Sequence, residues 1–354
     1  MAMKRINIRD LSLEEIEALI SSLGKERYRA RQIMKWLYSG GGVQSFEEMT
    51  TLSKPFRSQM EELAFIGLPE IEKIQASKDG TKKILFRLED DLFIESVLIP
   101  GKNHWTACIS TQVGCRMGCR FCLTARQGFR RNLRPSEITG QLEIILSSLP
   151  EGPNVRSIVL MGMGEPLANY RNTLKALGIL TSDYGFGFSN RKITLSTCGV
   201  VPMIRQLGRD ICINLAVSLN APDDAVRNQL MPVNWKYPLE SLLAACRDYP
   251  MPGRRMLTFE YILIDGVNAS PAHAEMLSRL LRGIRCKLNL IRFNEFPGCP
   301  FKSPSEDTVL AFQQILVKHH FTAIIRASRG RDILAACGQL SGKALEENTS
   351  QCLV

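Results

Sequence analysis

Three cysteines on one short segment are the strongest indication of chemistry in this 354-residue sequence. Cys115, Cys119 and Cys122 lie within CRMGCRFC and place three thiols on one loop. A structural zinc site is closed and needs four ligands, so Cys108 or His104 would have to complete it. A four-iron cluster held by three cysteines leaves one iron open to a substrate. The missing fourth ligand therefore favours an open iron–sulfur centre.

A regular alternation of strands and helices begins at about residue 105. The predicted strands are 106–111, 156–161, 192–196, 212–218, 257–264, 286–291 and 322–327. The predicted helices are 136–148, 171–181, 201–207, 239–248, 271–282 and 305–318. Seven strands joined by six crossover helices predict a parallel α/β core, either an incomplete barrel or a doubly wound sheet. In both architectures the chemistry collects at the carboxyl ends of the strands.

The segments after these strands fit one shared site. The cysteine segment follows the first strand and MGMGEP the second, and STCG and SLNAP follow the next two. In MGMGEP, Gly162 and Gly164 would let the backbone approach a ligand closely, and Glu165 offers a carboxylate acceptor. A Gly-Glu-Pro turn by itself is more often only a turn, so its position beside the cysteine segment is what makes it informative.

Two regions precede the core. Residues 1–70 predict a small helical accessory domain that is expected to contact RNA, in which SLEEIEALISSLG begins with a capping box. Residues 71–101 predict a short antiparallel β meander that links this domain to the core. The core is expected to span 102–345, followed by a tail at 346–354.

Composition indicates the kind of partner. The formal net charge is +10 and the pI is about 9.1, which favours a polyanionic partner, most simply nucleic acid. No signal peptide or membrane-spanning run is evident, so a cytoplasmic protein without membrane contact is expected. In a reducing compartment, eleven cysteines indicate metal or redox chemistry rather than a disulfide framework.

The cysteine spacing, with Phe121 before the last cysteine, resembles the signature of radical S-adenosylmethionine enzymes. In such enzymes the amino and carboxylate groups of S-adenosylmethionine fill the open iron position, and electron transfer yields a 5′-deoxyadenosyl radical. The resemblance implies that Glu165 accepts a hydrogen bond from the ammonium group of the cofactor. Ser196, Ser218 and Asn220 would bond its carboxylate and ribose, although each is a weak signal singly.

Longer motifs are similar to those of the RlmN/Cfr family of RNA adenine methyltransferases. They are CISTQVGCRMGCRFCLTARQGFRRNL, MGMGEPLANY, ITLSTCGVVP, LAVSLNAP and RDILAACGQLSG, and they cover nearly the whole chain in family order. The resemblance implies a radical-SAM partial (β/α)6 barrel, one 4Fe-4S cluster and two S-adenosylmethionine molecules per turnover. It also implies 23S rRNA and tRNA as substrates and an electron donor such as flavodoxin or ferredoxin. A monomer is expected.

The resemblance assigns roles residue by residue. Cys115, Cys119 and Cys122 match the cluster ligands. Cys337 matches the cysteine that carries a methyl group, Cys108 the second reactive cysteine, and Glu95 the proton acceptor. The residues that match S-adenosylmethionine contacts are Gly164, Glu165, Ser196, Ser218, Leu219, Asn220 and Asn294.

The implied reaction methylates adenine C2, an electron-poor carbon that cannot attack a sulfonium methyl group. One S-adenosylmethionine methylates Cys337, and a second provides the radical that takes a hydrogen from this S-methyl group. The methylene radical adds to the ring and gives a transient protein–RNA adduct. Glu95 then takes the ring proton, and attack of Cys108 on Cys337 releases the base and leaves a disulfide bond.

Three alternatives stay open at this stage. Methylation of adenine C8 would use the same motifs as methylation of C2. Another radical S-adenosylmethionine enzyme, such as an activase of a glycyl radical protein, would need neither Cys108 nor Cys337. A zinc-stabilised RNA-binding module would not need the Gly-Glu-Pro turn.

An arginine-rich segment is predicted to contact RNA. ARQGFRRNLR places Arg126, Arg130, Arg131 and Arg134 around an aromatic residue, directly after the cysteines. Arginine pairs with phosphate and stacks on unpaired bases. Because an adenine must leave its stack to reach a buried site, single-stranded or opened RNA is expected.

Overall fold

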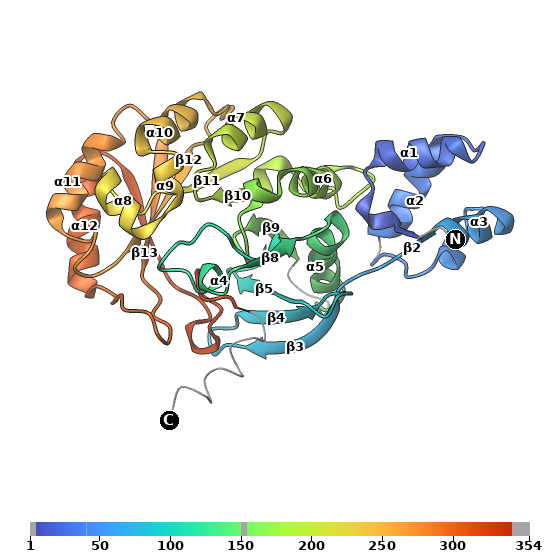
Figure 1. Cartoon of the computed structure of the whole chain (residues 1–354), viewed down its shortest axis with the longest axis horizontal. Coiled ribbons are helices and arrows are strands. Elements are labelled where there is room, and N and C mark those ends of the chain that lie inside the picture. The colour runs from blue at the N-terminus through green and yellow to red at the C-terminus, as the bar shows by residue number, and fades with distance from the viewer. Residues whose placement is uncertain (1–4, 40, 150–153, 342–354) are drawn as a thin grey trace.

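The computed structural model describes residues 5–39, 41–149 and 154–341. The predicted tail at 346–354 and the end of the predicted core, 342–345, lie outside the described residues. The first part of the chain forms a small helical unit with its own hydrophobic core, at one end of the molecule (Figure 1). Its elements are β1 (Ile6–Asn7), η1 (Ile8–Asp10), α1 (Leu13–Ser22), α2 (Tyr28–Tyr38), η2 (Phe46–Glu48), α3 (Lys54–Leu63) and β2 (Ala64–Phe65).

The predicted capping box at the start of α1 is present. The N–H of Glu15 donates to Ser12 Oγ at 3.3 Å, and the N–H of Ser12 donates to a Glu15 carboxylate oxygen at 2.8 Å. These two bonds satisfy backbone donors that a helix leaves unpaired at its first turn.

Ten strands form the main sheet. Seven of them are parallel and follow in chain order: β6 (Trp105–Cys108), β9 (Val155–Leu160), β10 (Ile193–Thr197), β11 (Asn214–Ser218), β12 (Leu257–Leu263), β13 (Cys286–Arg292) and β14 (Thr322–Arg326). All seven predicted strands are confirmed. Every residue of β12 is buried, as expected for a parallel strand covered on both faces.

The crossover helices are also confirmed. They are α5 (Pro135–Ser147), α6 (Tyr170–Thr181), α7 (Val201–Asp210), α10 (Leu239–Asp248), α11 (Pro271–Leu280) and α12 (Glu306–Lys318). Short elements that the sequence did not predict are α4 (Leu123–Arg126), α8 (Asp224–Leu230), α9 (Val233–Lys236), η3 (Pro166–Asn169), η4 (Asn190–Lys192) and η5 (Arg331–Ile333).

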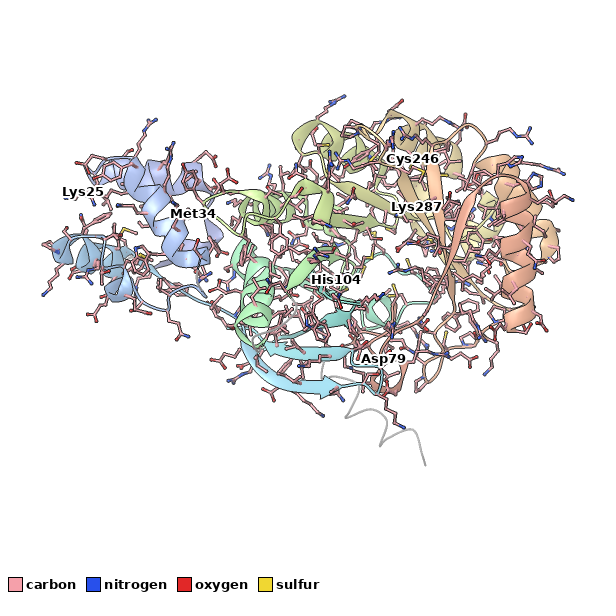
Figure 2. All side chains as sticks on the ribbon, turned by 180° about the vertical axis from the view of Figure 1, so that it is seen from behind. Lys25, Met34, Asp79, His104, Cys246 and Lys287 are labelled. Carbon is pink, nitrogen blue, oxygen red and sulfur yellow. The ribbon has the colours of Figure 1, made fainter. Side chains whose placement is uncertain are left out.

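Three antiparallel strands extend the parallel sheet at one edge. They are β3 (Glu70–Ala76), β4 (Lys82–Arg87) and β5 (Phe93–Pro100), and β5 pairs with β6. This meander is therefore continuous with the core sheet, and Asp79 marks the turn between β3 and β4 (Figure 2). Since β3 and β14 are the two edges, the sheet does not close on itself within the described residues. The α/β fold with an incomplete barrel is confirmed.

A buried ion pair attaches the N-terminal unit to the core. The Arg9 side chain is fully buried and forms a bidentate ion pair with Glu143 on α5, in which Arg9 Nη2 lies 2.7 Å from Glu143 Oε1. Such a planar pair fixes the orientation of the two side chains as well as their distance.

No helix in the described ranges is long and apolar enough to span a membrane.

Candidate active site

The cysteine segment forms a loop closed by a small hairpin. β7 (Gln112–Gly114) and β8 (Phe129–Asn132) pair in antiparallel fashion, and α4 lies within the loop between them. Gly114 has φ of 71°, and a Cβ there would stand 1.8 Å from the carbonyl oxygen of Gly128. Only glycine fits this neck, so the hairpin holds the two ends of the cysteine loop together.

The three predicted cluster ligands lie within electrostatic range of one another. Cys115 is buried, while Cys119 and Cys122 are partly exposed. Burial, together with Cys122, raises the pKa of the Cys115 thiol to about 12. Burial and the charges of Cys122 and Cys115 raise the pKa of Cys119 well above its usual range. A bound metal centre would therefore be needed to keep these groups as thiolates at neutral pH.

The donor set fits a cluster better than a single metal ion. Among the described residues, no three Cys, His, Asp or Glu side chains converge closely enough to hold one ion. A four-iron cluster bonds each cysteine to a different iron, so its thiols are neighbours without converging on one point. The closed zinc site with Cys108 or His104 as fourth ligand is therefore not formed in the described parts of the chain.

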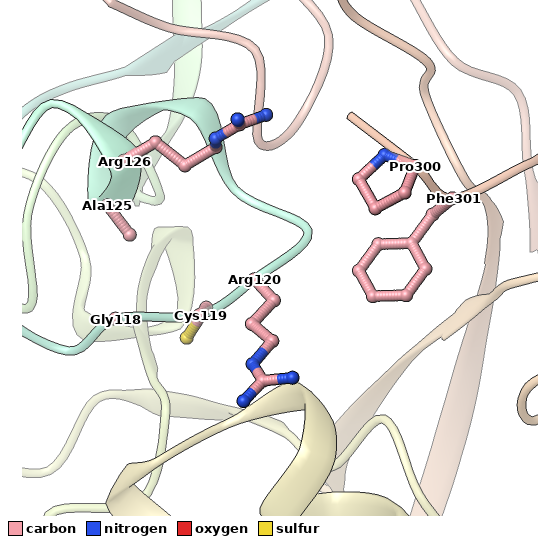
Figure 3. Close-up of a pocket in the computed structure, with 7 residues that line it drawn as sticks. All are labelled: Gly118, Cys119, Arg120, Ala125, Arg126, Pro300 and Phe301. Atoms are coloured by element: carbon pink, nitrogen blue, oxygen red, sulfur yellow. The ribbon is translucent and has the colours of Figure 1, made fainter. Parts of the chain in front are cut away.

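A cavity of about 400 Å³ opens beside the middle cysteine of the loop (Figure 3). It is lined by Gly118, Cys119, Arg120, Ala125, Arg126, Pro300 and Phe301. Arg126 also donates a hydrogen bond to the carbonyl oxygen of Gly298 at 2.8 Å. The cavity thus gives a ligand access to Cys119, next to two guanidinium groups that favour an anion.

The Gly-Glu-Pro turn lies beside the cysteine loop, as predicted. The Glu165 carboxylate is buried and accepts the N–H of Cys198 at 2.8 Å and the N–H of Leu167 at 3.0 Å. Burial raises its pKa, and its charge in turn raises the pKa of Cys115 and Cys119. A carboxylate has more acceptor sites than these two bonds use, so it can still accept from an ammonium group.

The two glycines of this turn pack against protein. A Cβ at Gly162 would stand 2.6 Å from Ser110 Oγ, and a Cβ at Gly164 would stand 2.5 Å from Gln112 Cβ. Close approach of a ligand was the expected reason for these glycines. The described contacts indicate a different reason for the two glycines. The turn after β9 packs directly on the segment after β6, and this leaves no room for a side chain.

A buried arginine ties together the ends of β10 and β11. Arg227 is fully buried and donates to the carbonyl oxygens of Cys198 (2.7 Å), Leu219 (3.0 Å) and Ser218 (3.2 Å). Ser218 and Leu219 are predicted S-adenosylmethionine contacts, so Arg227 fixes the backbone on which they lie. The sequence did not single out Arg227.

Two further predicted cofactor contacts make internal hydrogen bonds. Ser196 Oγ donates to Glu260 Oε2 at 3.0 Å. Asn220 is fully buried with φ of 59°, and its Oδ1 accepts the N–H of Ile262 at 2.8 Å. The Asn220 side chain therefore holds the turn after β11.

Asn294, which follows β13, offers an unused acceptor. Its Nδ2 donates to the carbonyl oxygen of Cys337 at 3.3 Å, whereas its buried Oδ1 has no hydrogen-bond partner among the described residues. A buried polar atom without a partner is costly, and a bound ligand would remove that cost. This observation fits the predicted role of Asn294.

The segment that carries Cys337 packs on the cysteine loop. The N–H of Leu123 donates to the carbonyl oxygen of Gly338 at 2.7 Å, and Thr124 Oγ1 donates to that of Leu340 at 2.6 Å. These contacts join the end of the described chain to α4, about 215 positions earlier.

The two predicted reactive cysteines, 229 positions apart, lie within electrostatic range of each other. Cys108 is buried at the end of β6, and burial raises its pKa to about 12. Cys337 is an exposed residue by its surface area, and desolvation together with the nearby Glu260, Cys108 and Cys122 raises the pKa of its thiol. Both are free thiols.

Glu260 lies near these thiols and was not predicted. It is a buried carboxyl group on β12, and burial raises its pKa. A charged residue inside the otherwise apolar strand LTFEYIL was the signal that could have identified it.

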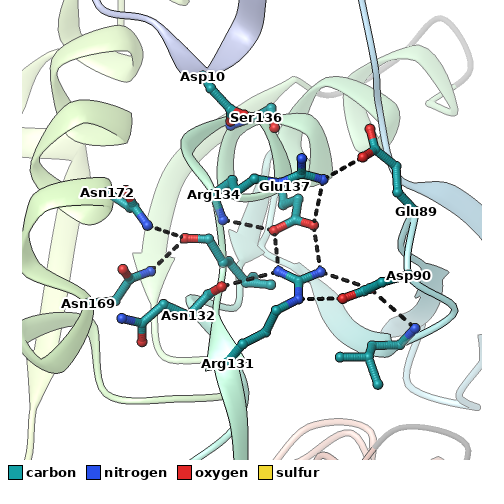
Figure 4. Close-up of polar contacts among 12 residues, drawn as sticks. Asp10, Glu89, Asp90, Arg131, Asn132, Arg134, Ser136, Glu137, Asn169 and Asn172 are labelled. Atoms are coloured by element: carbon teal, nitrogen blue, oxygen red, sulfur yellow. Dashed lines mark hydrogen bonds and ion pairs between the residues drawn. The ribbon is translucent and has the colours of Figure 1, made fainter. Parts of the chain in front are cut away.

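Two of the four arginines predicted to contact RNA form ion pairs with carboxylates of the same chain (Figure 4). Arg131 pairs with Asp90 at 2.6 Å and with Glu137 at 2.8 Å. Arg134 pairs with Glu89 at 2.8 Å, and also with Glu137. The RNA prediction for these two side chains is revised, because their carboxylate partners already satisfy them. Arg126 and Arg130 are exposed, and neither forms an ion pair with another described residue.

Comparisons with known families and structures agree with this arrangement. Residues 6–66 match the ribosomal RNA large subunit methyltransferase N-terminal domain, and residues 109–277 match the Radical SAM superfamily. A crystal structure of a radical SAM methyltransferase from Sphaerobacter thermophilus superposes with a TM-score of 0.89 at 43% identity. That match covers 96% of this chain and 100% of the other.

Similar proteins extend over the same length. The chain is 79% identical to the dual-specificity RNA methyltransferase RlmN of Syntrophus aciditrophicus, with 98% of this chain and 99% of that protein covered. It is 52% identical to the protein of the same name from Geobacter sulfurreducens, with 96% and 92% covered. With its cysteine loop, Gly-Glu-Pro turn and two neighbouring thiols, the chain belongs to the RlmN family of radical SAM RNA methyltransferases.

Proposed function

We propose that the protein methylates C2 of adenosine in RNA, with 23S rRNA and some tRNAs as substrates. The names of the similar proteins support the dual specificity. The docking of the Cys337 segment on the cysteine loop is the observation that carries the proposal, because the thiol is then within electrostatic range of Cys108 and of Cys122, one of the proposed cluster ligands.

The cofactors follow from the donor groups. Cys115, Cys119 and Cys122 would hold one 4Fe-4S cluster. Glu165 and Asn294 would bind S-adenosylmethionine through carboxylate and amide oxygens, with further contacts from Gly164, Ser196 and the Ser218–Leu219–Asn220 stretch. When bound, the cluster and S-adenosylmethionine would supply the methyl group and the one-electron chemistry that joins the methyl carbon to the adenine. Two S-adenosylmethionine molecules would be consumed per turnover.

Three side chains of the protein perform the remaining steps. Cys337 carries the one-carbon unit as S-methylcysteine and then links protein to RNA. Glu95 takes the ring proton. The Cys108 thiolate attacks Cys337 sulfur, so that an S–S bond forms and the S–C bond breaks, with its electron pair left on the carbon, which takes up a proton. A two-electron thiol reductant restores the cysteines.

The remaining partners follow from this chemistry. A one-electron donor such as flavodoxin or ferredoxin would reduce the cluster. RNA substrates of this kind are consistent with a cytoplasmic location, and we propose that the protein acts as a monomer.

Mass spectrometry of the modified adenosine, with reference standards for both isomers, tests the proposed position. RNA prepared without modification and incubated with the reduced enzyme should yield 2-methyladenosine. If only 8-methyladenosine is found, the alternative C8 specificity is correct; if no methyl group is transferred, the proposed function is wrong.

Arg130 is expected to contact RNA, whereas Arg131 is expected to support the fold. Changing Arg130 to Ala removes an exposed guanidinium that forms no ion pair within the described part of the chain, so RNA affinity should fall and the slope of log affinity against log salt should decrease by about one. Filter binding at several salt concentrations measures both quantities. Changing Arg131 to Ala should instead lower thermal stability, because the buried Glu137 loses a partner. Equal salt slopes for the Arg130 variant and the parent protein would contradict this assignment.

A further inference from the structure

The segment that carries Cys337 is held by the antiparallel meander on both sides of the thiol. Before the thiol, Ser77 Oγ in the β3–β4 turn donates to Asp332 at 2.6 Å. After it, the N–H of Ser341 donates to Oε2 of Glu95, the proposed proton acceptor, at 2.7 Å. In the proposed reaction adenine C2 becomes joined to the carbon on Cys337 and gives its proton to Glu95. The ring must therefore lie against residues 337–341, and the side chains between the two ends are candidates for holding the base.

Gln339 lies in the middle of this stretch and has one unused hydrogen-bonding atom. The residue is 2% exposed, and its Nε2 donates to the carbonyl oxygen of Glu295 at 2.7 Å. Its buried Oε1 has no hydrogen-bond partner among the residues that the structure describes. A buried carbonyl oxygen without a partner is costly, so this atom is suited to a ligand that brings a hydrogen-bond donor.

Hydrogen bonds place the Gln339 amide beside the proposed methyl carrier. Glu295, which accepts from Gln339, directly follows Asn294, and Asn294 Nδ2 donates to the carbonyl oxygen of Cys337 at 3.3 Å. The loop after β13 therefore holds the stretch at two neighbouring points. Since the same stretch also packs on the cysteine loop, the unused acceptor of Gln339 belongs to the proposed active site.

The exocyclic amine of adenine is a donor that fits this acceptor. On the ring, C2 and the N6 amine lie on one edge, separated by N1 and C6. A base whose C2 faces Cys337 therefore presents its amine to the same stretch of chain. Enzymes that act on an unstacked base read it by hydrogen bonds to this edge. Guanine carries an acceptor oxygen where adenine carries the amine, so the carbonyl oxygen of Gln339 would select against it.

We propose that Gln339 is a specificity-determining residue whose Oε1 accepts a hydrogen bond from the N6 amine of the target adenosine. This inference rests on the function proposed above. S-adenosylmethionine carries an adenine amine as well, so the experiment must separate the two sources. The target base is the better fit, because Gln339 is two residues from the thiol to which the target becomes joined. Most of the proposed S-adenosylmethionine contacts lie instead at the ends of β9, β10 and β11.

Gln339→Met tests the proposal together with RNA that carries purine riboside, which lacks the amine, at the target position. Met has a similar length but offers no carbonyl oxygen. The rate of methyl transfer in a single turnover is measured for adenosine RNA and for purine RNA. The ratio of the two rates should be about tenfold lower in Gln339→Met than in the parent protein, since a buried acceptor left unpaired by purine costs roughly that much. Comparing ratios removes the difference in intrinsic reactivity between the two rings.

Gln313→Met is the matched control, because Gln313 on α12 also donates through Nε2 to a backbone carbonyl oxygen, that of Ala323, at 2.8 Å. This variant should keep the ratio of the parent protein. In Gln339→Met, S-methylation of Cys337, measured from the peptide mass, should stay normal and shows that the variant is folded.

Three results would overturn the proposal. In the first, Gln339→Met slows both RNAs equally, as a residue that only supports the fold would. In the second, the ratio is unchanged while S-methylation of Cys337 needs more S-adenosylmethionine, which would assign the acceptor to the cofactor. In the third, the parent protein itself methylates both RNAs at equal rates, a result that needs no variant. If the parent protein methylates neither RNA, the proposed function fails instead.

Discussion

Replacing Cys119 by Ala is expected to abolish iron retention and cleavage of S-adenosylmethionine together. The change removes one of three protein ligands from a loop whose ends are fixed by the β7–β8 hairpin, so Cys115 and Cys122 cannot move to compensate. Cys119 also lines the cavity beside the proposed cluster site. Iron and sulfide content after anaerobic purification, and the yield of 5′-deoxyadenosine with a chemical reductant, measure the two losses.

Cys212→Ala is the matched control for this variant. Cys212 lies just before β11, at the opposite end of that strand from the proposed S-adenosylmethionine contacts, and its sulfur accepts a hydrogen bond from Arg255 at 2.7 Å. Its loss should leave about four irons and four sulfides per chain and normal cleavage, as expected for an intact 4Fe-4S cluster. A Cys119→Ala protein that keeps its cluster and still forms 5′-deoxyadenosine would show that the ligand assignment is wrong.

Cys108→Ala is expected to accumulate RNA joined covalently to the protein through Cys337. Cys337 can still carry the one-carbon unit and join it to adenine, but no second thiol is available to attack its sulfur. A slow, nuclease-sensitive band on denaturing gels measures this species. Each enzyme molecule should react once and then stay attached to RNA, so the amount of adduct should not exceed the amount of enzyme.

Cys337→Ala is expected to stop the reaction before any bond to RNA forms. The double variant Cys108→Ala/Cys337→Ala should therefore lack the slow band, which identifies Cys337 as the attachment point. Cys286→Ala, which removes a buried thiol at the start of β13, controls for the loss of a core cysteine. Normal turnover of Cys108→Ala without an adduct would mean that the two-cysteine mechanism does not operate in this protein.

Periodicity was sufficient to predict the parallel core. Strands such as β12 are buried along their whole length and read as continuous apolar runs, while helices such as α12 show one apolar face. The β7–β8 hairpin and α4 were missed because elements of three or four residues are too short for a repeating pattern. The shape of the cysteine loop therefore had to come from the structure.

Contacts between distant segments were the part of the site that sequence could not predict. Arg131 looked like a phosphate ligand because Asp90, its partner, lies 41 positions earlier on another element. Arg227 likewise gave no signal, since three of its four described hydrogen-bond partners are backbone carbonyl oxygens. The buried ion pair between Lys83 on β4 and Glu95 on β5, 3.0 Å apart, could have been predicted, because the register of a β hairpin determines which residues share a face.

The attachment of the Cys337 segment to the meander has a consequence for biosynthesis. Ser77 and Asp332 are separated by 255 positions, so this contact forms only when nearly the whole chain has left the ribosome. Contacts between residues so far apart in the sequence form late and slowly, after local structure has formed. The nascent protein therefore builds its sheet and cysteine loop first and gains Cys337, the proposed methyl carrier, last, which keeps Cys108 and Cys337 apart until translation is almost finished.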